Sequence, residues 1–116
     1  MKKFIFLTAT VLFTIAFATN KVKAQKVYSC KYSSNAQVKV YVTQYSSDAD
    51  LIVYKCSYSS DATGNNGKWY FTGYSSDAQK KIFFTEYSSD ADLKIYFTKY
   101  SSDAGWKNTS KKHLMY

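Results

Sequence analysis

The residues of this chain that could do chemistry lie in one repeated five-residue motif, which we call the word. YSSDA occurs five times and its variant YSSNA once, beginning at Tyr32, Tyr45, Tyr58, Tyr74, Tyr87 and Tyr100. Serine near aspartate is a pattern of nucleophilic catalysis, but such a serine needs a general base that a third group holds in place. The only histidine is His113, in the tail, and one residue cannot serve six copies. A catalytic site is normally unique whereas a turn is reused, so we expect a structural joint and no enzyme.

The predicted joint follows the tyrosine of each word. Short side chains that carry oxygen bond nearby backbone amides and form Asx and ST turns. The alanine that comes next is small enough for a tight corner. The structural turn residues are therefore Ser33, Ser34, Asn35, Ser46, Ser47, Asp48, Ser59, Ser60, Asp61, Ser75, Ser76, Asp77, Ser88, Ser89, Asp90, Ser101, Ser102 and Asp103.

Two units add a second acid and resemble a calcium motif. Asp48 with Asp50, and Asp90 with Asp92, place alternate carboxylates in repeated turns, and such acids chelate Ca²⁺ in some repeat proteins. At the second of these positions the other four units carry Gln37, Thr63, Gln79 and Gly105. The sequence also contains no C-x-x-C pair. We therefore expect solvated turn acids, no metal site and no cofactor, with calcium as the alternative.

The words are joined by β-type segments of regular length. Units with a period of 13 residues, or 16 in the third, begin at Val27, Val40, Val53, Trp69, Ile82 and Ile95. β-Branched and aromatic residues alternate there with period two, which is typical of strands. The face that carries Tyr41, Thr43 and Tyr45 changes little between units, so we expect it to face the interior. The pattern predicts an all-β single domain of tandem strand-plus-turn repeats.

Two places break the repeat. The first is a candidate variable loop with a strong Asn-Gly hairpin signal, formed by Thr63, Gly64, Asn65, Asn66 and Gly67. The second is a divergent tail, residues 105–116. In this tail Trp106 falls where Leu51 and Leu93 fall in other units, so we expect the tail to begin by packing like another repeat. If the protein has a functional site, we expect it at these two places, where the sequence around the repeated word changes.

Residues 1–24 have the layout of a secretory signal peptide. A basic start is followed by 15 mostly apolar residues, Phe4 to Ala18, and by small or apolar Val22 and Ala24 ahead of a cleavage site before Gln25. The apolar stretch is short for a bilayer-spanning helix, which needs about 20 residues. A cut after Ala18 and an uncleaved anchor are the alternatives. We expect an exported protein, periplasmic, cell-surface or secreted, whose folded domain is residues 25–116.

The charge of the folded domain does not favour nucleic acid. Residues 25–116 contain 12 Lys, 8 acids and no Arg, a net charge of +4 (12 − 8). The lysines are scattered over the repeats. They also lack the forked guanidinium that reads guanine or clamps phosphate. We therefore expect a solvated basic surface and no nucleic-acid partner.

Cys30 and Cys56 occupy the same position of the first and third units. An exported chain with an even number of cysteines favours a disulfide. This bond would close a loop of 26 residues. Such a loop is worth about 3–4 kcal/mol in the chain-entropy model. Two buried thiols that replace threonine are the alternative.

The tandem units, with the final run YFTKYSSDAGWKNTSKKHLMY, resemble a small bacterial exported family of unknown function. That family carries YSSDA-type 13-residue repeats and is associated with a deeply knotted β fold, a septoil or seven-crossing torus knot. The resemblance implies that each repeat is one arc wound around a common axis, with identical corners because the arcs are nearly equivalent. It implies no activity and no catalytic residue. Without a knot, the repeats would form a small β-meander or solenoid.

Two functions fit this sequence. The first is a stable exported structural or protein-interaction domain, monomeric and outside the membrane after signal cleavage, with a protein or cell-envelope partner. The second is a module that binds a glycan-like ligand, with Trp69 or Trp106 stacking on its rings. A concave face with exposed aromatic rings would favour the second function, and fully packed tryptophans would count against it.

Overall fold

The computed structural model describes residues 24–116, in which seven short strands form one sheet. The strands are β1 (Lys26–Ser29), β2 (Val38–Val42), β3 (Leu51–Lys55), β4 (Lys68–Phe71), β5 (Lys80–Phe84), β6 (Leu93–Thr98) and β7 (Gly105–Trp106). The expected all-β repeat domain is therefore confirmed. Apart from Ala24, the predicted signal peptide lies outside the described residues. Within the described part, none of the helices is long and apolar enough to cross a membrane.

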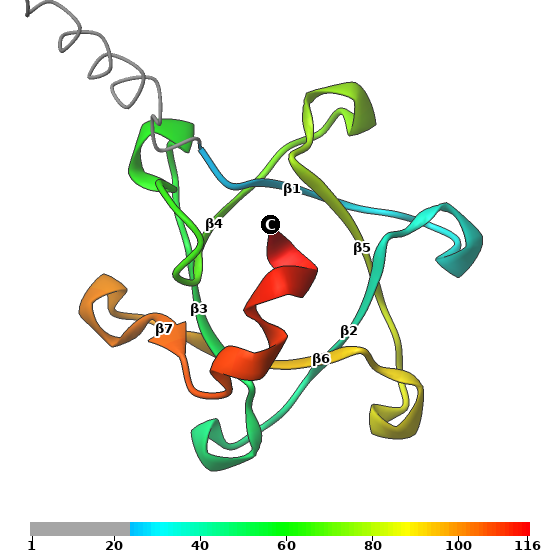
Figure 1. The fold of residues 1–116 in the computed structure, drawn as a ribbon. Helices are drawn as coiled ribbons and strands as arrows, with labels where there is room; N and C mark the ends of the chain where they lie inside the picture. Colours follow the sequence, from blue (N-terminus) through cyan, green and yellow to red (C-terminus); the bar gives the residue numbers. More distant parts are fainter. Residues whose placement is uncertain (1–23) are drawn as a thin grey trace, which may run out of the picture.

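The strands close into a ring that the chain follows in steps of two places (Figure 1). The order is β4-β1-β5-β2-β6-β3-β7, and β3 also pairs with β4, which closes the ring. β1, β2 and β3 fill alternate places on a first circuit. β4, β5 and β6 fill the places between them on a second circuit, and β7 pairs with the start of β3 on the edge where β4 pairs with its end. Among β1 to β6, every strand of the first circuit therefore pairs only with strands of the second.

All pairings among β1 to β6 are parallel, including β3 with β4, where Tyr54 lies opposite Lys68. A hairpin at Asn66-Gly67 would have made β3 and β4 antiparallel, so that prediction is wrong. Gly67 has a φ of +89°, and a Cβ atom built on it would collide with the carbonyl oxygen of Ile52. The glycine therefore marks a close approach of two backbones and not a two-residue turn.

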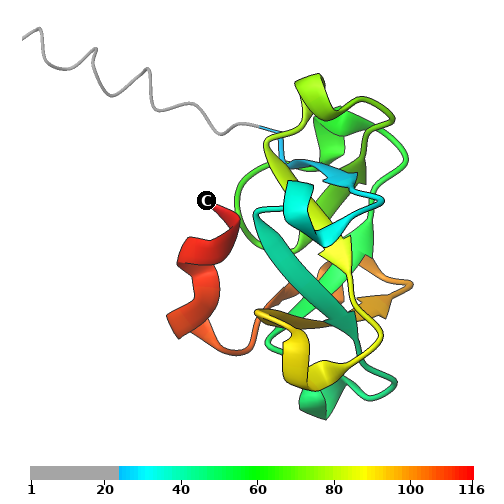
Figure 2. The same cartoon turned by 90° about the vertical axis from the view of Figure 1, so that its right-hand side faces the viewer.

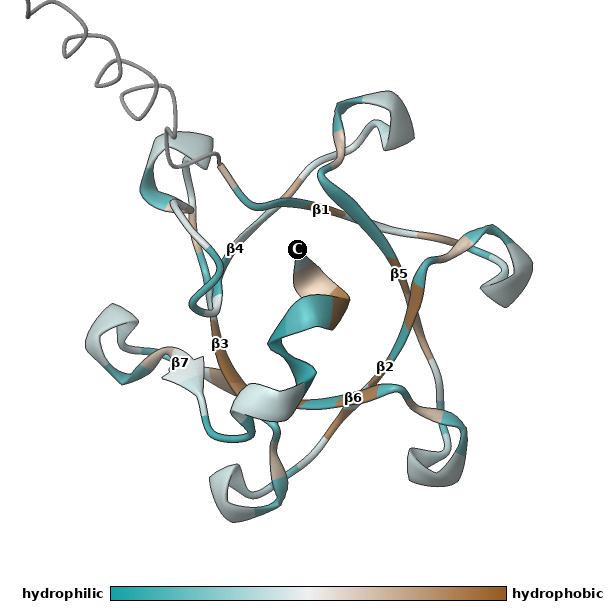
Figure 3. Ribbon diagram, in the orientation of Figure 1, coloured by the Kyte–Doolittle hydropathy of each residue, from teal (hydrophilic) through white to brown (hydrophobic). Residues whose placement is uncertain are grey.

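The first residue of each unit fills the interior of the ring. These buried side chains are Val27, Val40, Val53, Trp69, Ile82 and Ile95. Val38, Leu51 and Leu93, two residues earlier on their strands, are also buried, because alternate residues of a strand face the same side. Figure 3 shows hydrophobic stretches along β2, β3, β5 and β6, whereas the corners are pale or hydrophilic. The core is thus a set of stacked layers inside the ring.

The face that was predicted to be interior is only partly buried, and the prediction is wrong for the tyrosines of the repeated word. Thr43 is buried, but Tyr41 is only half-buried and Tyr45 is 65% exposed. Tyr45 follows the end of β2, where the chain leaves the sheet and strand alternation no longer sets side-chain direction. The constancy of the exposed tyrosine between units therefore reflects equivalent corners of the ring and not burial.

Each repeated word forms a short 3-10 helix at a corner of the ring (Figure 1). The helices are η1 (Ser33–Asn35), η2 (Ser46–Asp48), η3 (Ser59–Asp61), η4 (Ser75–Asp77), η5 (Ser88–Asp90) and η6 (Ser101–Asp103). In η2, the amide of Asp48 donates to the carbonyl of Tyr45 and the amide of Ala49 to that of Ser46, both at 3.1 Å. The serine hydroxyls of the words make no hydrogen bond among residues 24–116. Backbone bonds, and not the predicted ST turns, therefore hold the corners. In two corners the carboxylates of Asp77 and Asp103 also accept hydrogen bonds from the hydroxyls of Thr72 and Thr98, at 3.3 and 3.5 Å.

The C-terminal tail closes one end of the ring (Figure 2). β7 pairs antiparallel with the start of β3, and the chain then forms η7 (Thr109–Met115). Met115 is fully buried, and its carbonyl accepts hydrogen bonds from the side-chain amides of Gln25 at 2.9 Å and Gln79 at 3.0 Å. Both glutamines lie just before a strand, so η7 covers the end of the ring where the strands begin. We call the opposite end, where β1 to β6 finish, the open end.

Cys30 and Cys56 are buried and unbonded, so the predicted disulfide is not formed. The two residues follow β1 and β3, which lie two places apart with β4 between them. Neighbouring strands are about 4.8 Å apart, which separates β1 from β3 by about 9.6 Å. A disulfide requires Cα atoms within about 7 Å of each other. The same position in two units therefore does not make these cysteines neighbours.

Candidate binding face at the carboxyl ends of the strands

Three phenylalanines meet at the open end. Phe71, Phe84 and Phe97 are the third residues of the last three units, and we call them the phenylalanine triad. The two circuits alternate, so the third residues follow one another around the ring in the order Phe71, Ser29, Phe84, Val42, Phe97 and Lys55. A phenylalanine thus occupies every second place, and its side chain faces the same way as the buried residue two positions earlier.

The phenylalanine triad forms the floor of a shallow apolar depression. The ring centroids of Phe71 and Phe84 are 6.3 Å apart, and the other two pairs are 6.5 Å apart. These distances suit favourable aromatic contacts. The triad is half-buried, and Phe71 packs edge-on against the buried Trp69 at 6.0 Å. Together with Val42 and Lys55, the triad lines a depression of about 360 Å³.

Lys55 places a positive charge at the edge of this depression. Its ammonium nitrogen lies 4.7 Å from the ring centre of Phe97 and 5.7 Å from that of Phe71. These are cation–π distances. The side chain is exposed, and no carboxylate of residues 24–116 lies within ion-pair distance of it. The depression is therefore apolar at its floor and cationic at its edge.

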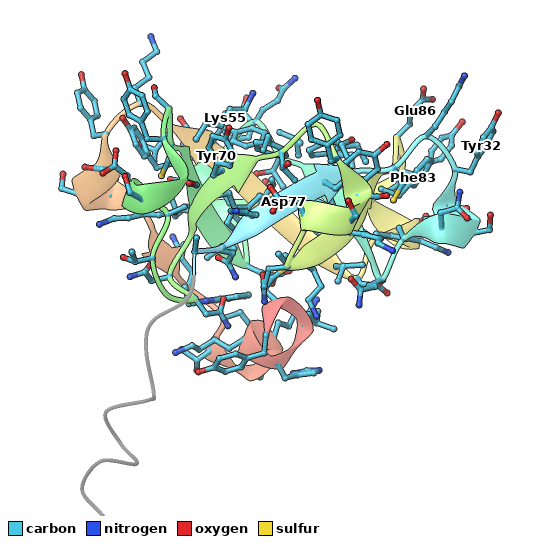
Figure 4. The ribbon with its side chains drawn as sticks, turned by 90° about the horizontal axis from the view of Figure 1, so that it is seen from above. Tyr32, Lys55, Tyr70, Asp77, Phe83 and Glu86 are labelled. Carbon is cyan, nitrogen blue, oxygen red and sulfur yellow. The ribbon has the colours of Figure 1, made fainter. Side chains whose placement is uncertain are left out.

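Six exposed tyrosines follow the ends of β1 to β6, at the same end of the ring as the triad, and we call them the tyrosine rim. They are Tyr32, Tyr45, Tyr58, Tyr74, Tyr87 and Tyr100. Their exposed fractions run from 60% for Tyr32 to 74% for Tyr74. In Figure 4, Tyr32, Lys55 and Glu86 point away from the side of the ring that η7 covers. An exposed aromatic surface of this extent is typical of an interaction site.

The threonines of the repeat fix the rim to the ends of the strands. The backbone amide of Tyr74 donates to the hydroxyl of Thr72 at 3.3 Å, and the same bond recurs at Tyr87 and Tyr100. In the second unit, the hydroxyl of Thr43 donates to the carbonyl of Tyr45 at 2.9 Å. The threonine hydroxyl therefore bonds to the backbone of the rim tyrosine in four units, by two different arrangements.

Cys30 and Cys56 replace this threonine in the first and third units. Their sulfur atoms lie 3.6 Å and 4.0 Å from backbone carbonyls, of Asn35 and Tyr54 respectively. Burial raises the pKa of the Cys56 thiol, the charge of Asp61 raises it further, and Lys68 opposes the shift. The thiolate is the reactive form of cysteine. This thiol is therefore a structural group and a poor nucleophile.

Asp50 and Asp92, which follow the repeated words of the second and fifth units, bind the neighbouring strand. Asp50 accepts a hydrogen bond from the amide of Lys94, and Asp92 accepts one from the amide of Lys39, both at 2.9 Å. The side-chain oxygen of Gln37 does the same for β5. These oxygens extend the sheet ladder by one bond. In residues 24–116, no group of three or more histidines, cysteines or acids is placed to hold a metal ion.

Asp50 also ties the tail to the ring. Its burial favours a higher pKa, but hydrogen bonds from Lys94, Asn108 and Lys111, with the charge of Lys111, hold the pKa of this carboxyl below its ordinary value of 3.8. The ammonium of Lys111 lies 3.3 Å from the carboxylate, whose side chain is 14% exposed. The ionised form of Asp50 is therefore part of the folded structure.

The two tryptophans are packed, which counts against the alternative that they stack on a ligand. Trp69 is fully buried, and the partly buried Trp106 donates its indole N–H to the carbonyl of Asn65 at 2.9 Å. The side-chain amide of Asn65 donates in turn to the carbonyl of Lys112 at 3.0 Å. The candidate variable loop and the tail thus contact each other at the closed end, away from the tyrosine rim.

Neither the phenylalanine triad nor Lys55 was among the predicted site residues. The sequence does carry a signal for them, because the third residue is phenylalanine in the last three units and in none of the first three. This difference becomes a cluster only when the order of the strands around the ring is known. The tyrosine rim was recognised as a repeated feature, but it was assigned to the interior.

Comparisons with known proteins identify the fold family and no activity. No curated protein and no solved structure matches this chain. A family model described as the 7(1) septoil knot domain matches residues 24–107, which span all six units and β7. The fold that the repeats resemble is thereby confirmed, and the two interleaved circuits are the form that it takes here. This chain belongs to the septoil knot domain family.

Proposed function

We propose that this protein is an exported interaction domain that binds a partner protein through its open end. One observation carries the proposal: six exposed tyrosines follow the ends of β1 to β6, at the same end of the ring as the half-buried phenylalanine triad. Tyrosine and phenylalanine are enriched at protein interfaces. Tyrosine also supplies a large amphipathic contact area at a low cost in side-chain entropy.

The ring suits this role because it presents the rim in one repeated geometry. The six tyrosines have backbone φ values between −129° and −120° and ψ values between 125° and 141°. Each one is followed by the same short 3-10 helix. A surface that is ordered before binding loses less entropy when a partner arrives. The repeats therefore hold the tyrosines of the rim in one fixed backbone geometry.

A groove beside η6 supports a second candidate, a glycan-like ligand. Its volume is about 470 Å³, and its lining includes Tyr96, Phe97 and Tyr100 together with Lys99 and Asp103. Aromatic rings beside a few polar groups are the usual composition of a small-ligand site. The burial of Trp69 and the packing of Trp106 remove the strongest stacking platforms, so a protein partner is better supported.

Capture of partners from a cell-envelope extract tests the proposal. The double variant Tyr45→Ser, Tyr87→Ser removes two rim side chains and leaves the buried layers unchanged. Tyr116→Ser is the matched control, because this tyrosine is 76% exposed but follows η7 at the closed end. We expect the double variant to lose a protein that wild type and control both retain. Equal capture by all three would contradict a role for the rim, and release by free oligosaccharide would favour the glycan alternative.

Export is a separate part of the proposal and is supported by the layout of residues 1–24. The intact mass of protein recovered outside the cytoplasm should correspond to a chain that starts at Gln25. A mass that starts at Thr19 would place the cut after Ala18. Retention of the full-length chain in the cells would refute cleavage.

A further inference from the structure

We infer that the open end binds an acidic protein segment, which inserts one apolar side chain over the phenylalanine triad and sets a carboxylate beside Lys55. This inference rests on the proposed function and specifies the chemistry of the partner. It is carried by two properties of the same depression. Its floor is apolar, and the charge at its edge has no carboxylate partner within residues 24–116.

The apolar part of the inference follows from the position of the triad. Phe71, Phe84 and Phe97 are half-buried, so each ring keeps an apolar surface that only an incoming group can cover. A depression of about 360 Å³ has room for a side chain of the size of leucine or phenylalanine. Binding energy at protein interfaces is concentrated in such central anchors, and surrounding contacts exclude water from them. The tyrosine rim is placed to form those surrounding contacts.

The acidic part of the inference follows from the charge at the edge of the depression. Lys55 is the only charged residue among the five that line it. Its side chain is exposed. The ammonium of Lys55 sits against two aromatic rings, where covering by a partner would remove water from it. A partner carboxylate would compensate that loss through a charge-assisted hydrogen bond.

Other occupants fit this face less well. A second copy related by a twofold axis through the depression would bring Lys55 near its own counterpart. A bilayer presents a flat surface. The tyrosines of the rim are 60–74% exposed while the triad is half-buried, so a bilayer would touch the rim and not the floor. A protruding side chain of a protein segment reaches both.

Selection of random peptides on the purified protein tests the inference. Wild type, Lys55→Glu and Lys99→Glu are used in parallel. Lys99 is the matched control, because it is an exposed lysine of the same face that does not line the depression. Synthetic peptides from the wild-type selection are then measured for affinity to all three proteins, and thermal melts confirm that each variant is folded. Phe84→Ala, checked in the same way, tests the floor.

We expect the selected peptides to combine aspartate or glutamate with a leucine or an aromatic residue. Lys55→Glu should lower their affinity by about tenfold or more, as for loss of a hydrogen bond between charged groups. Lys99→Glu should lower it by less than about threefold, as for a screened rim charge. Phe84→Ala should also weaken binding. A new selection on Lys55→Glu should enrich lysine or arginine in place of the acids.

Two kinds of failure are distinguishable. Peptides that depend on Tyr45 and Tyr87 but carry no acid, and that bind Lys55→Glu as well as wild type, would overturn this inference and leave the proposed function standing. If no peptide depends on the rim tyrosines, the proposed function fails as well. Rim-dependent binding to vesicles of anionic phosphatidylglycerol, or a wild-type dimer that Tyr45→Ser, Tyr87→Ser dissociates, would overturn the inference in favour of a membrane or a second copy.

Discussion

Replacement of Gly67 by alanine tests how tightly the two circuits of the ring approach each other. Gly67 has a φ of +89°, its carbonyl accepts the amide of Tyr54 at 2.8 Å, and its position is buried. An added Cβ would collide with the carbonyl oxygen of Ile52 and would lie 3.1 Å from the amide nitrogen of Gly105. Both obstacles are backbone atoms of packed strands, so neither can move aside as a flexible side chain would.

The expected loss is the sum of two effects. A left-handed backbone costs a residue with a Cβ atom about 1–2 kcal/mol. Forcing an extra methyl group into a packed position costs about 1–3 kcal/mol more. Gly67→Ala should therefore lower the free energy of unfolding by about 2–5 kcal/mol, a large part of the roughly 5–15 kcal/mol that holds a typical domain together.

Gly73→Ala is the matched control, because Gly73 is exposed and an added Cβ would meet no atom within 4 Å. This change should be neutral or stabilise the protein by up to about 1 kcal/mol, since alanine restricts the unfolded chain. Urea unfolding followed by circular dichroism measures both variants. Unfolding and refolding curves must coincide, which requires long incubation for a knotted chain. A loss below about 1 kcal/mol for Gly67→Ala would refute the close approach of the two backbones.

Three further predictions concern the tail and the thiols. Folding lowers the pKa of Asp50, so its carboxylate stabilises the fold above the unfolded pKa, and this stabilisation is lost as the pH falls through the folded pKa. The free energies of unfolding of wild type and Asp50→Asn should therefore converge at low pH in an acid titration. A difference between them that stays constant with pH would contradict this. Met115→Ala should lower stability by about 2–5 kcal/mol in urea unfolding, whereas Tyr116→Ala, an exposed neighbour, should change it by less than about 0.5 kcal/mol. Cys30 and Cys56 should react with iodoacetamide only after unfolding and should give the same intact mass with and without reductant; a mass two hydrogens lighter without reductant would show a disulfide.

The positions of the bends could be predicted from the repeated word, and the strands could be predicted from the apolar openings between them. Val40 and Ile82, which begin their units, are buried as such residues usually are. The direction of Tyr45 could not be predicted in this way. It lies beyond the end of β2, where the period-two rule stops, and its recurrence in every unit comes from the symmetry of the corners.

Strand pairing could not be predicted from local pattern at all. β1 pairs with β4 and β5, which lie three and four strands further along the chain, and nothing in the segment around Val27 selects a distant strand over a near one. Only the resemblance to a knotted family indicated that the arcs wind around a common axis. Because strand order could not be predicted, a disulfide between Cys30 and Cys56 was considered and the phenylalanine triad was missed. Both questions depend on the order of strands around the ring.

The interleaving of the two circuits determines when the chain can begin to fold. β1, β2 and β3 have no partner among themselves, so a chain that emerges from a ribosome has no native strand pair until β4 (Lys68–Phe71) arrives. In an ordinary solenoid each unit packs on the next, and units are added or lost one at a time. Here the neighbours of a unit are supplied by the following circuit. An inserted unit would lengthen one circuit and leave its strand without a new neighbour from the other, so this ring can change size only when both circuits gain or lose a unit.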